Sequence, residues 1–273
     1  MKFIKTIIFG MAYGVTSPVP GFDGGTFFIL FNVYEDIIHA AKLSNIRKNL
    51  PVILLFILGC GVGLFGISNL MMYLLTYHEM IMYSSFAGLI LGCTPLIYEK
   101  SALDLSKHKV NLKNSVIFLV SLALMLLYAF WGTTPEAYDH AYYAQEAFVP
   151  LPWIFVASCI SSVGMLIPGV GGAIIMLILG IYPSYIEALA TFNLAVLLTL
   201  IAGMACGMTA GIRVIRKLLV NYPGELYCAI LGFTLGSVVI VFPGFSASLV
   251  GMLSLLCVVF FTIFAYLFSK KAK

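Results

Sequence analysis

Two stretches of the chain carry nearly the same motif. Residues 20–34 read PGFDGGTFFILFNVY, and residues 168–182 read PGVGGAIIMLILGIY. At an offset of 148 residues the proline, two of the glycines and the last tyrosine coincide. In each copy a Pro-Gly break separates two apolar segments. Such breaks at corresponding places in two halves of a chain are typical of a transporter's binding site.

The similarity between the halves extends beyond the motif. At an offset of 144 residues, four glycines of the first half match four of the second, and the slip of four residues fits a surface loop. The matched glycines are Gly59, Gly63, Gly88 and Gly92, then Gly203, Gly207, Gly232 and Gly236. We therefore expect one repeat at 1–100 and a second at 151–245.

The composition places the chain in a membrane. Of its 273 residues, 62% are hydrophobic and 10% are charged, and long apolar runs alternate with short polar loops. We expect one transmembrane domain over 1–273. The net charge of +4 does not indicate nucleic-acid binding, because the basic residues lie in loops beside spans. The six cysteines lie inside apolar segments without metal or disulfide spacing, which predicts packing roles.

Six apolar segments are long enough, or nearly so, to cross a bilayer, which takes about 20 residues. They are 51–75, 80–99, 114–132, 192–217, 225–242 and 247–269. Four segments are too short or too broken to cross alone, and they flank the two motifs as the pairs 3–16 with 24–41 and 151–166 with 171–190. Each pair predicts a re-entrant helical hairpin, whose irregular tip requires protein or a wet cavity around it.

The positive-inside rule tests this arrangement. If both termini lie inside and neither hairpin crosses, all 15 Lys and Arg residues fall on one side, whereas the outer loop 133–150 carries acidic residues alone. The predicted fold is an all-α polytopic membrane protein with about six full spans. Its repeats enter from opposite faces, an inverted topology, with 114–132 as the connecting span and 247–269 as the terminal span.

The hairpin tips are the main candidates for a binding site. Glycines leave backbone N–H groups uncovered, and a helix N-terminus favours an anion. The alternative is that these glycines only permit tight turns and close packing. The candidate binding residues in the tips are Ser17, Gly21, Asp23, Gly24, Gly25 and Thr26 in the first hairpin and Gly169, Gly171 and Gly172 in the second.

Charged groups near the spans are further candidates. An ionisable side chain at membrane depth indicates function by default, so Asp23 is predicted to carry a coupling proton or cation, or else to cap a helix. Glu35 and His39 lie four residues apart on one helix face and are candidates for the same ion coupling, or interfacial residues. Arg213 and Arg216 are either phosphate ligands or ordinary anchors at the end of a span.

Residues 243–248, PGFSAS, resemble the PGxSRS phosphate motif of undecaprenyl-pyrophosphate phosphatases. Ala247 stands where those enzymes have arginine, and the chain has no ExxxE carboxylate pair. Without these charges a phosphatase loses most of the electrostatic stabilisation that its reaction needs. We therefore expect no enzyme activity and predict an outward loop here.

The paired motifs, together with GFTLGS at 232–237, resemble the signature stretches of the polyprenyl-phosphate translocase family (PopT type) over most of the chain. Asp23 stands where that family usually has Ser, and Gly171 replaces a Ser of the second motif. The resemblance implies a multi-pass protein of the bacterial plasma membrane. It implies a flippase that returns undecaprenyl phosphate from the outer to the cytoplasmic leaflet for cell-wall synthesis.

The expected partners are therefore polyprenyl phosphate and membrane lipids, with no nucleic acid, cofactor or metal. A transporter of a small soluble anion with the same architecture is the main alternative, and a membrane lipid phosphatase is the weaker one. The sequence leaves the coupling ion, the direction of transport and any homo-oligomer open.

Overall fold

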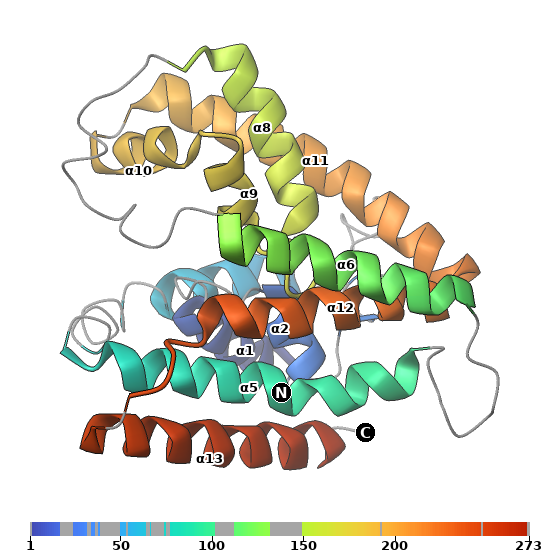
Figure 1. Cartoon of the computed structure of the whole chain (residues 1–273). Helices are drawn as coiled ribbons and strands as arrows, with labels where there is room; N and C mark the ends of the chain where they lie inside the picture. The colour runs from blue at the N-terminus through green and yellow to red at the C-terminus, as the bar shows by residue number, and fades with distance from the viewer. Residues whose placement is uncertain are drawn as a thin grey trace.

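The structure is a computed structural model that describes residues 2–16, 24–31, 34–35, 38, 50–52, 54–63, 66, 74, 77–101, 112–131, 149–191, 193–246 and 248–271. Over these residues every regular element is a helix, which confirms the predicted all-α class. The helices shown in Figure 1 are α1 (Lys2–Thr16), α2 (Gly24–Leu30), α5 (Glu79–Lys100), α6 (Leu112–Trp131), α8 (Leu151–Gly164), α9 (Gly172–Ile178), α10 (Tyr182–Thr191), α11 (Leu194–Asn221), α12 (Pro223–Val241) and α13 (Leu249–Lys271).

Five of these helices, α5, α6, α11, α12 and α13, are long and apolar enough to cross a membrane. They coincide with five of the six predicted spans within a few residues. The sixth predicted span, 51–75, lies partly outside the described residues, and an apolar helix runs over Leu50–Gly63. The chain is therefore a multi-pass membrane protein, and its described spans begin and end close to where hydropathy predicts.

The helices that flank the Pro-Gly motifs are short. The longest of the second hairpin, α8, has 14 residues and rises about 21 Å, less than the roughly 30 Å of a bilayer core. The leg predicted as one segment over 171–190 is in fact two helices. Gly180 has φ +70°, a left-handed conformation that ends α9, because glycine adopts it without steric cost.

The matched glycines of the two halves make matched contacts. In each half, two glycines one turn apart on one helix bring its backbone against the carbonyl groups of an earlier helix that flanks the Pro-Gly motif, α1 in the first half and α8 in the second. A Cβ atom at any of them would overlap a backbone oxygen. The glycine and carbonyl pairs are Gly59 with Ile7, Gly63 with Met11, Gly203 with Phe155 and Gly207 with Cys159. The offset of 148 residues that relates the motifs also relates Ile7 to Phe155 and Met11 to Cys159.

In a second set of matched glycines, each glycine packs on a helix that follows the other half. Glycines of α5 pack on α13, and the corresponding glycines of α12 pack on α6, so the helix that follows each half covers the other half (Figure 1). The pairs of glycine and carbonyl residue are Gly88 with Val258, Gly92 with Thr262, Gly232 with Phe118 and Gly236 with Leu122. Since α5 also packs on α12, these four helices form one continuous layer, and its core contains Ile90, Cys93 and Ile230.

The helix over Leu50–Gly63 offers a matched test of the glycine contacts. Gly63→Ala places a methyl group on the Met11 carbonyl, whereas a Cβ on Gly61 would meet nothing within 4 Å. We expect Gly63→Ala to lower the free energy of unfolding by about 1–3 kcal/mol, as overpacking does. We expect Gly61→Ala to be neutral or to stabilise by up to about 1 kcal/mol, because alanine favours helix. Thermal unfolding in detergent measures both, and equal melting temperatures would contradict the contact.

Candidate functional site

The two Pro-Gly motifs lie against each other. Gly25, the second residue of α2, packs on the first residue of the second motif: a Cβ on Gly25 would lie 2.8 Å from the backbone nitrogen of Pro168. The hydroxyl of Tyr34, the last residue of the first motif, donates a 2.9 Å hydrogen bond to the carbonyl oxygen of Leu166. The hairpins therefore touch at two points of the first motif, Gly25 and Tyr34. We call the region where the tips meet the tip junction (residues 24–26 and 166–172).

The second tip is also held by α12. Gly169 and Gly171 have φ values of +84° and +66°, which few other residues adopt. A Cβ on Gly169 would lie 2.6 Å from the backbone nitrogen of Thr234. Gly25 thus has the packing role that the sequence allows, and Gly169 has both the packing and the turn role. The tip of the second hairpin is enclosed between α2 and α12.

Buried hydroxyl groups surround the tip junction. Thr26 follows Gly25 and is 0% exposed. Ser161 and Thr234 are equally buried, and their hydroxyl oxygens have no hydrogen-bond partner in the described part of the chain. The backbone of Ser161 borders Gly172, and that of Thr234 borders Gly169. A buried hydroxyl without a partner costs about 1–3 kcal/mol, so these groups are suited to a polar ligand.

Sequence reasoning missed Ser161 and Thr234. The signal was available in the run ASCISSVG at 157–164 and in GFTLGS at 232–237, where hydroxyl residues recur inside otherwise apolar helices. Other serines of these runs have local partners. The Ser162 hydroxyl donates 2.8 Å to the Cys159 carbonyl, and the Ser237 hydroxyl donates 2.8 Å to the Thr234 carbonyl.

Glu35 is the centre of a charged cluster that involves three separate parts of the chain. Its Oε1 accepts a hydrogen bond of 2.8 Å from Lys100 Nζ and one of 2.5 Å from the Tyr227 hydroxyl. The side chains of Lys100 and Glu35 are 32% and 39% exposed. Glu35 is therefore an ion-pair residue that links the first hairpin to the end of α5 and the start of α12. Lys100 and Tyr227 were not among the predicted site residues.

The other predicted residues lie apart from this cluster or outside the described chain. Arg213 is exposed and Arg216 half-buried near the end of α11. This end of α11 lies at the right of Figure 1, away from α2 and α9. Within the described residues neither forms an ion pair. The remaining predicted residues, Ser17, Gly21, Asp23 and His39, lie outside the described residues, and Gly24 begins α2.

The stretch at 243–248 links α12 to α13. Gly244 has φ +88°, and Ser246 and Ser248 are exposed. The Ser248 hydroxyl accepts a 3.2 Å hydrogen bond from the backbone N–H of Gly251 and so caps the start of α13. These serines have a structural role in a helix connection. Over the described residues, no three His, Cys, Asp or Glu side chains are grouped as metal ligands.

Comparison with known proteins identifies relatives over nearly the whole chain. The family model described as undecaprenyl phosphate translocase-like matches residues 4–111 and 67–254. A polyprenyl-phosphate transporter of Staphylococcus aureus is 27% identical over 257 residues, which cover 89% of this chain and 88% of the relative. A polyprenyl-phosphate transporter of Vibrio cholerae is 22% identical over 259 residues, covering 89% and 79%. No solved structure matches.

Gly169 and Gly180 provide a matched pair for testing the tip. Both have a left-handed backbone, but a Cβ at Gly180 meets nothing within 4 Å. We expect Gly180→Ala to cost about 1 kcal/mol of stability from backbone strain. Gly169→Ala should cost at least about 2 kcal/mol, because the overlap with Thr234 adds to the strain. Thermal unfolding of the two variants measures the difference, and equal losses would show that the tip does not press on α12.

Proposed function

Since the chain belongs to the undecaprenyl phosphate translocase-like family, we propose that it carries undecaprenyl phosphate from the outer to the cytoplasmic leaflet of a bacterial plasma membrane, where the lipid is reused in cell-wall synthesis. The family match over residues 4–111 and 67–254, which includes both hairpin motifs, is the observation that carries this proposal. The relatives are named transporters, and the chain is accordingly a transporter and not an enzyme.

The tip junction is the proposed site for the phosphate group during crossing. A phosphate that leaves water needs donors in place of its hydration shell. Hydroxyl groups at Ser161 and Thr234 that have no described partner support this placement, as does the left-handed glycine turn beside them. The tip glycines 21, 24, 25, 169, 171 and 172, with Ser17 and Thr26, belong to this proposed site.

The lipid tail is proposed to stay in the bilayer beside the bundle. Large apolar side chains are exposed along α6, α11 and α13, for example Leu119, Leu198 and Phe260 at 57%, 63% and 63%. Such faces suit a hydrocarbon solvent and a polyprenyl chain equally. The choice of the lipid over a soluble anion with the same phosphate chemistry therefore rests on the family match.

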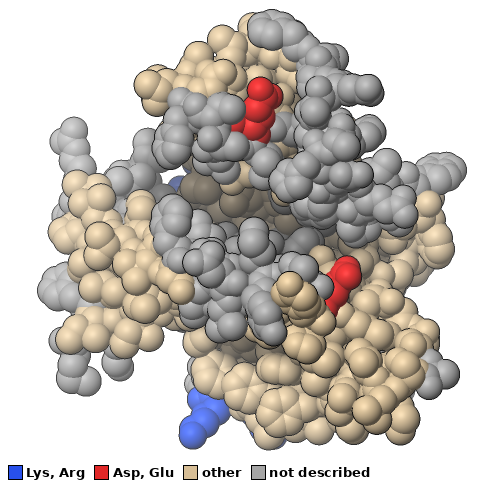
Figure 2. Space-filling view, turned by 90° about the vertical axis from the view of Figure 1, so that its left-hand side faces the viewer, with Lys and Arg blue, Asp and Glu red and all other residues tan. Residues whose placement is uncertain are grey.

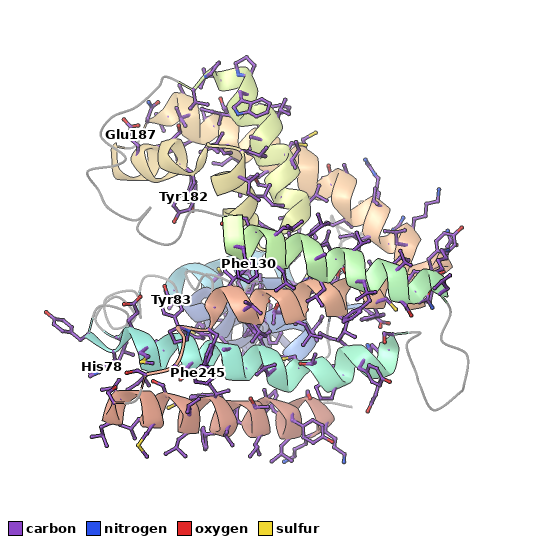
Figure 3. All side chains as sticks on the ribbon, viewed as in Figure 1. His78, Tyr83, Phe130, Tyr182, Glu187 and Phe245 are labelled. Carbon is purple, nitrogen blue, oxygen red and sulfur yellow. The ribbon has the colours of Figure 1, made fainter. Side chains whose placement is uncertain are left out.

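The proposed orientation places the basic end of the molecule in the cytoplasm. Most of the described Lys and Arg residues lie at the ends of α5, α11 and α13 and at the start of α6, and Lys2 and Lys5 lie at the start of α1. The ends of α5 and α11 and the start of α6 lie at the right of Figure 1. The opposite end carries His78 and Glu187 (Figure 3). That end faces the viewer in Figure 2. The positive-inside rule then supports inverted repeats with both termini inside.

Ion coupling is proposed to use a proton on Asp23, since a carboxylate beside a phosphate in a low-dielectric site favours its neutral form. Asp23→Asn removes titration while keeping a capping side chain. Glu35 and His39, in the same hairpin, are the proposed relay to the inside. Sodium binding at Asp23 is the competing possibility, and a transport rate that depends on sodium rather than on pH would favour it.

The first test is transport in proteoliposomes. We expect the wild-type protein to move fluorescent undecaprenyl phosphate between leaflets. Thr234→Val and Ser161→Ala should slow this transport at least about tenfold, since a phosphate that loses a donor is penalised by more than about 1.4 kcal/mol. Their stability should stay constant or rise, because each removes a buried hydroxyl that has no described partner.

Ser237→Ala is the matched control for these variants, since its hydroxyl lies on the same helix as Thr234 and already has a partner. It should transport at the wild-type rate. If Thr234→Val and Ser161→Ala transport the lipid at the wild-type rate, the two hydroxyls do not belong to the site. Transport of a short soluble phosphate ester as fast as the lipid would overturn the lipid assignment itself.

A second test concerns orientation. In a background without native cysteines, Lys271→Cys and Ser246→Cys place thiols at the two ends of α13, the first in its last turn and the second in the loop before it. We expect an impermeant maleimide to label position 246 in intact cells, and position 271 only after the membrane is opened. Labelling of position 271 from outside would reverse the proposed orientation.

A further inference from the structure

The cluster around Glu35 joins three separate parts of the fold. Glu35 follows the first hairpin motif, Lys100 ends α5, and Tyr227 lies in the first turns of α12. Lys100 Nζ and the Tyr227 hydroxyl both donate to the same carboxylate oxygen, at 2.8 and 2.5 Å. The ammonium group also lies 5.4 Å from the centre of the Tyr227 ring. One anionic oxygen thus holds together groups from α5, α12 and the first hairpin.

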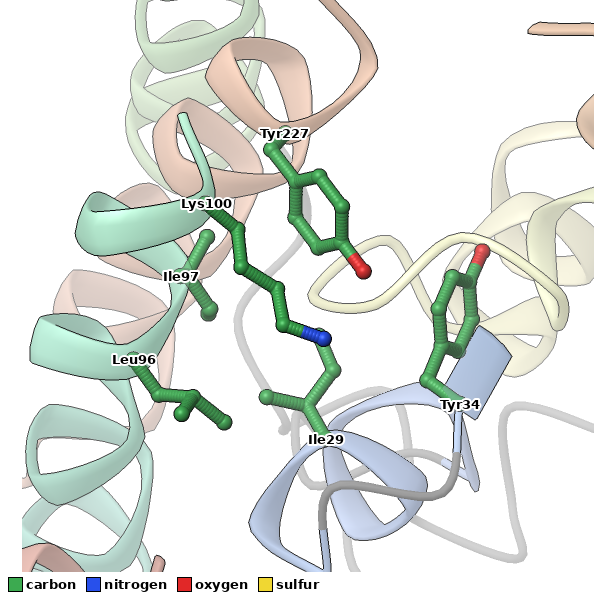
Figure 4. Close-up of a pocket in the computed structure, with 6 residues that line it drawn as sticks. All are labelled: Ile29, Tyr34, Leu96, Ile97, Lys100 and Tyr227. Atoms are coloured by element: carbon green, nitrogen blue, oxygen red, sulfur yellow. The ribbon is translucent and has the colours of Figure 1, made fainter. Parts of the chain in front are cut away.

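A small pocket with one apolar and one polar side lies beside this cluster. Ile29, Leu96 and Ile97 form the apolar wall, and Lys100, Tyr34 and Tyr227 supply the polar groups. In Figure 4 the Lys100 side chain extends from α5 across the pocket, toward the Tyr227 hydroxyl. The pocket is only about as large as one water molecule. Its ammonium and phenol can therefore receive a phosphate oxygen only in place of the Glu35 carboxylate oxygen that they now bind.

The pocket is close to the tip junction. Ile29 lies four residues after Gly25 on α2, a rise of about 6 Å. Tyr34, on the pocket's opposite side, is bonded to Leu166 of the second hairpin. A phosphate that leaves the tips toward the basic end of the molecule therefore meets Lys100 within about one helical turn.

We propose that Lys100 and Tyr227 form an inner anion site, which receives the phosphate group of the substrate as it leaves the tip junction. The Glu35 carboxylate occupies this site while no phosphate is there. This inference rests on the proposed function. The Glu35 oxygen accepts hydrogen bonds from Lys100 and Tyr227, as a phosphate oxygen would. When phosphate arrives, Lys100 and Tyr227 donate to the phosphate instead of to Glu35.

The exposure of the pair favours an exchange of this kind over a fixed structural bridge. Lys100 and Glu35 keep about a third of their side-chain surface exposed, and ion pairs with that much solvent contribute little to stability. Opening the pair therefore costs little free energy. A phosphate monoester carries up to two negative charges near neutral pH and attracts Lys100 more strongly than one carboxylate does.

The chain contains a matched control for this cluster. Lys113 Nζ lies 3.3 Å from Glu225 Oε1 and 5.4 Å from the centre of the Tyr222 ring. This pair has the same chemical groups at the same basic end of the molecule. It does not line the pocket beside Lys100, and the Lys113 side chain is 60% exposed.

Protection from acylation tests the proposal on the intact protein. The full-length chain in detergent is treated with an impermeant acetylating ester, with farnesyl phosphate or farnesol present, and peptides are quantified by mass spectrometry. We expect farnesyl phosphate to slow acetylation of Lys100 at least about fivefold and to leave Lys113 unchanged, since one bound charge pair shields only the amine it contacts. Farnesol should protect neither. Equal acetylation of Lys100 with and without farnesyl phosphate overturns the proposal.

Variants give the sign of the effect. Glu35→Gln removes the competing charge and keeps an acceptor for Lys100 and Tyr227, so farnesyl phosphate should protect Lys100 at several-fold lower concentration. Lys100→Met should slow undecaprenyl phosphate transport about tenfold or more, while Lys100→Arg retains most of it and Lys113→Met all of it. If the ion pair is only a structural bridge, Glu35→Gln and Lys100→Met should lower the free energy of unfolding by similar amounts, and Glu35→Gln should not strengthen the binding of farnesyl phosphate. That result overturns the proposal.

Failure of this inference differs from failure of the proposed function. If the wild-type protein transports undecaprenyl phosphate and Lys100→Met does so equally well, the inner site is wrong and the function stands. If the wild-type protein transports no polyprenyl phosphate at all, both are wrong.

Discussion

Close approach of helix backbones at glycines is the constraint on which this fold depends. A transmembrane bundle gains little from the hydrophobic effect between its helices, because lipid is as apolar as they are. Packing against carbonyl groups at Gly59, Gly63, Gly203 and Gly207 provides the cohesion instead. It fixes a helix that flanks each Pro-Gly motif, α1 or α8, against a later helix of the same half.

The same close contact creates the polar environment of the candidate site. The second tip turns through two left-handed glycines and meets Gly25 on one side and α12 at Thr234 on the other. That enclosure removes water from Ser161 and Thr234 and leaves their hydroxyls without described partners. In the proposed function these hydroxyls serve as donors for the phosphate group, and the cost of leaving them unsatisfied favours its binding.

The cluster of Glu35, Lys100 and Tyr227 holds the first hairpin to α5 and α12 near the basic end of the molecule. Tyr34 bonds the second hairpin through Leu166, and the next residue, Glu35, bonds α5 and α12. Two adjacent residues thus connect both hairpins to the layer of spans. The partner exchange that we propose at Glu35 would therefore act on the elements that enclose the tip.

The sequence by itself determined the helical class, the described spans and the two motifs, because hydropathy and glycine spacing are local properties of the chain. The same motifs carried the resemblance to the family that the comparison confirmed. The sequence also indicated Glu35, but through its helical spacing from His39, and so it missed the partners Lys100 and Tyr227, which lie 65 and 192 residues away. Only the tertiary structure decided those partners, the burial of Thr234 and the packing of α6 on α12 and of α13 on α5. These contacts depend on which helices meet, and the composition of a single helix does not record its neighbours.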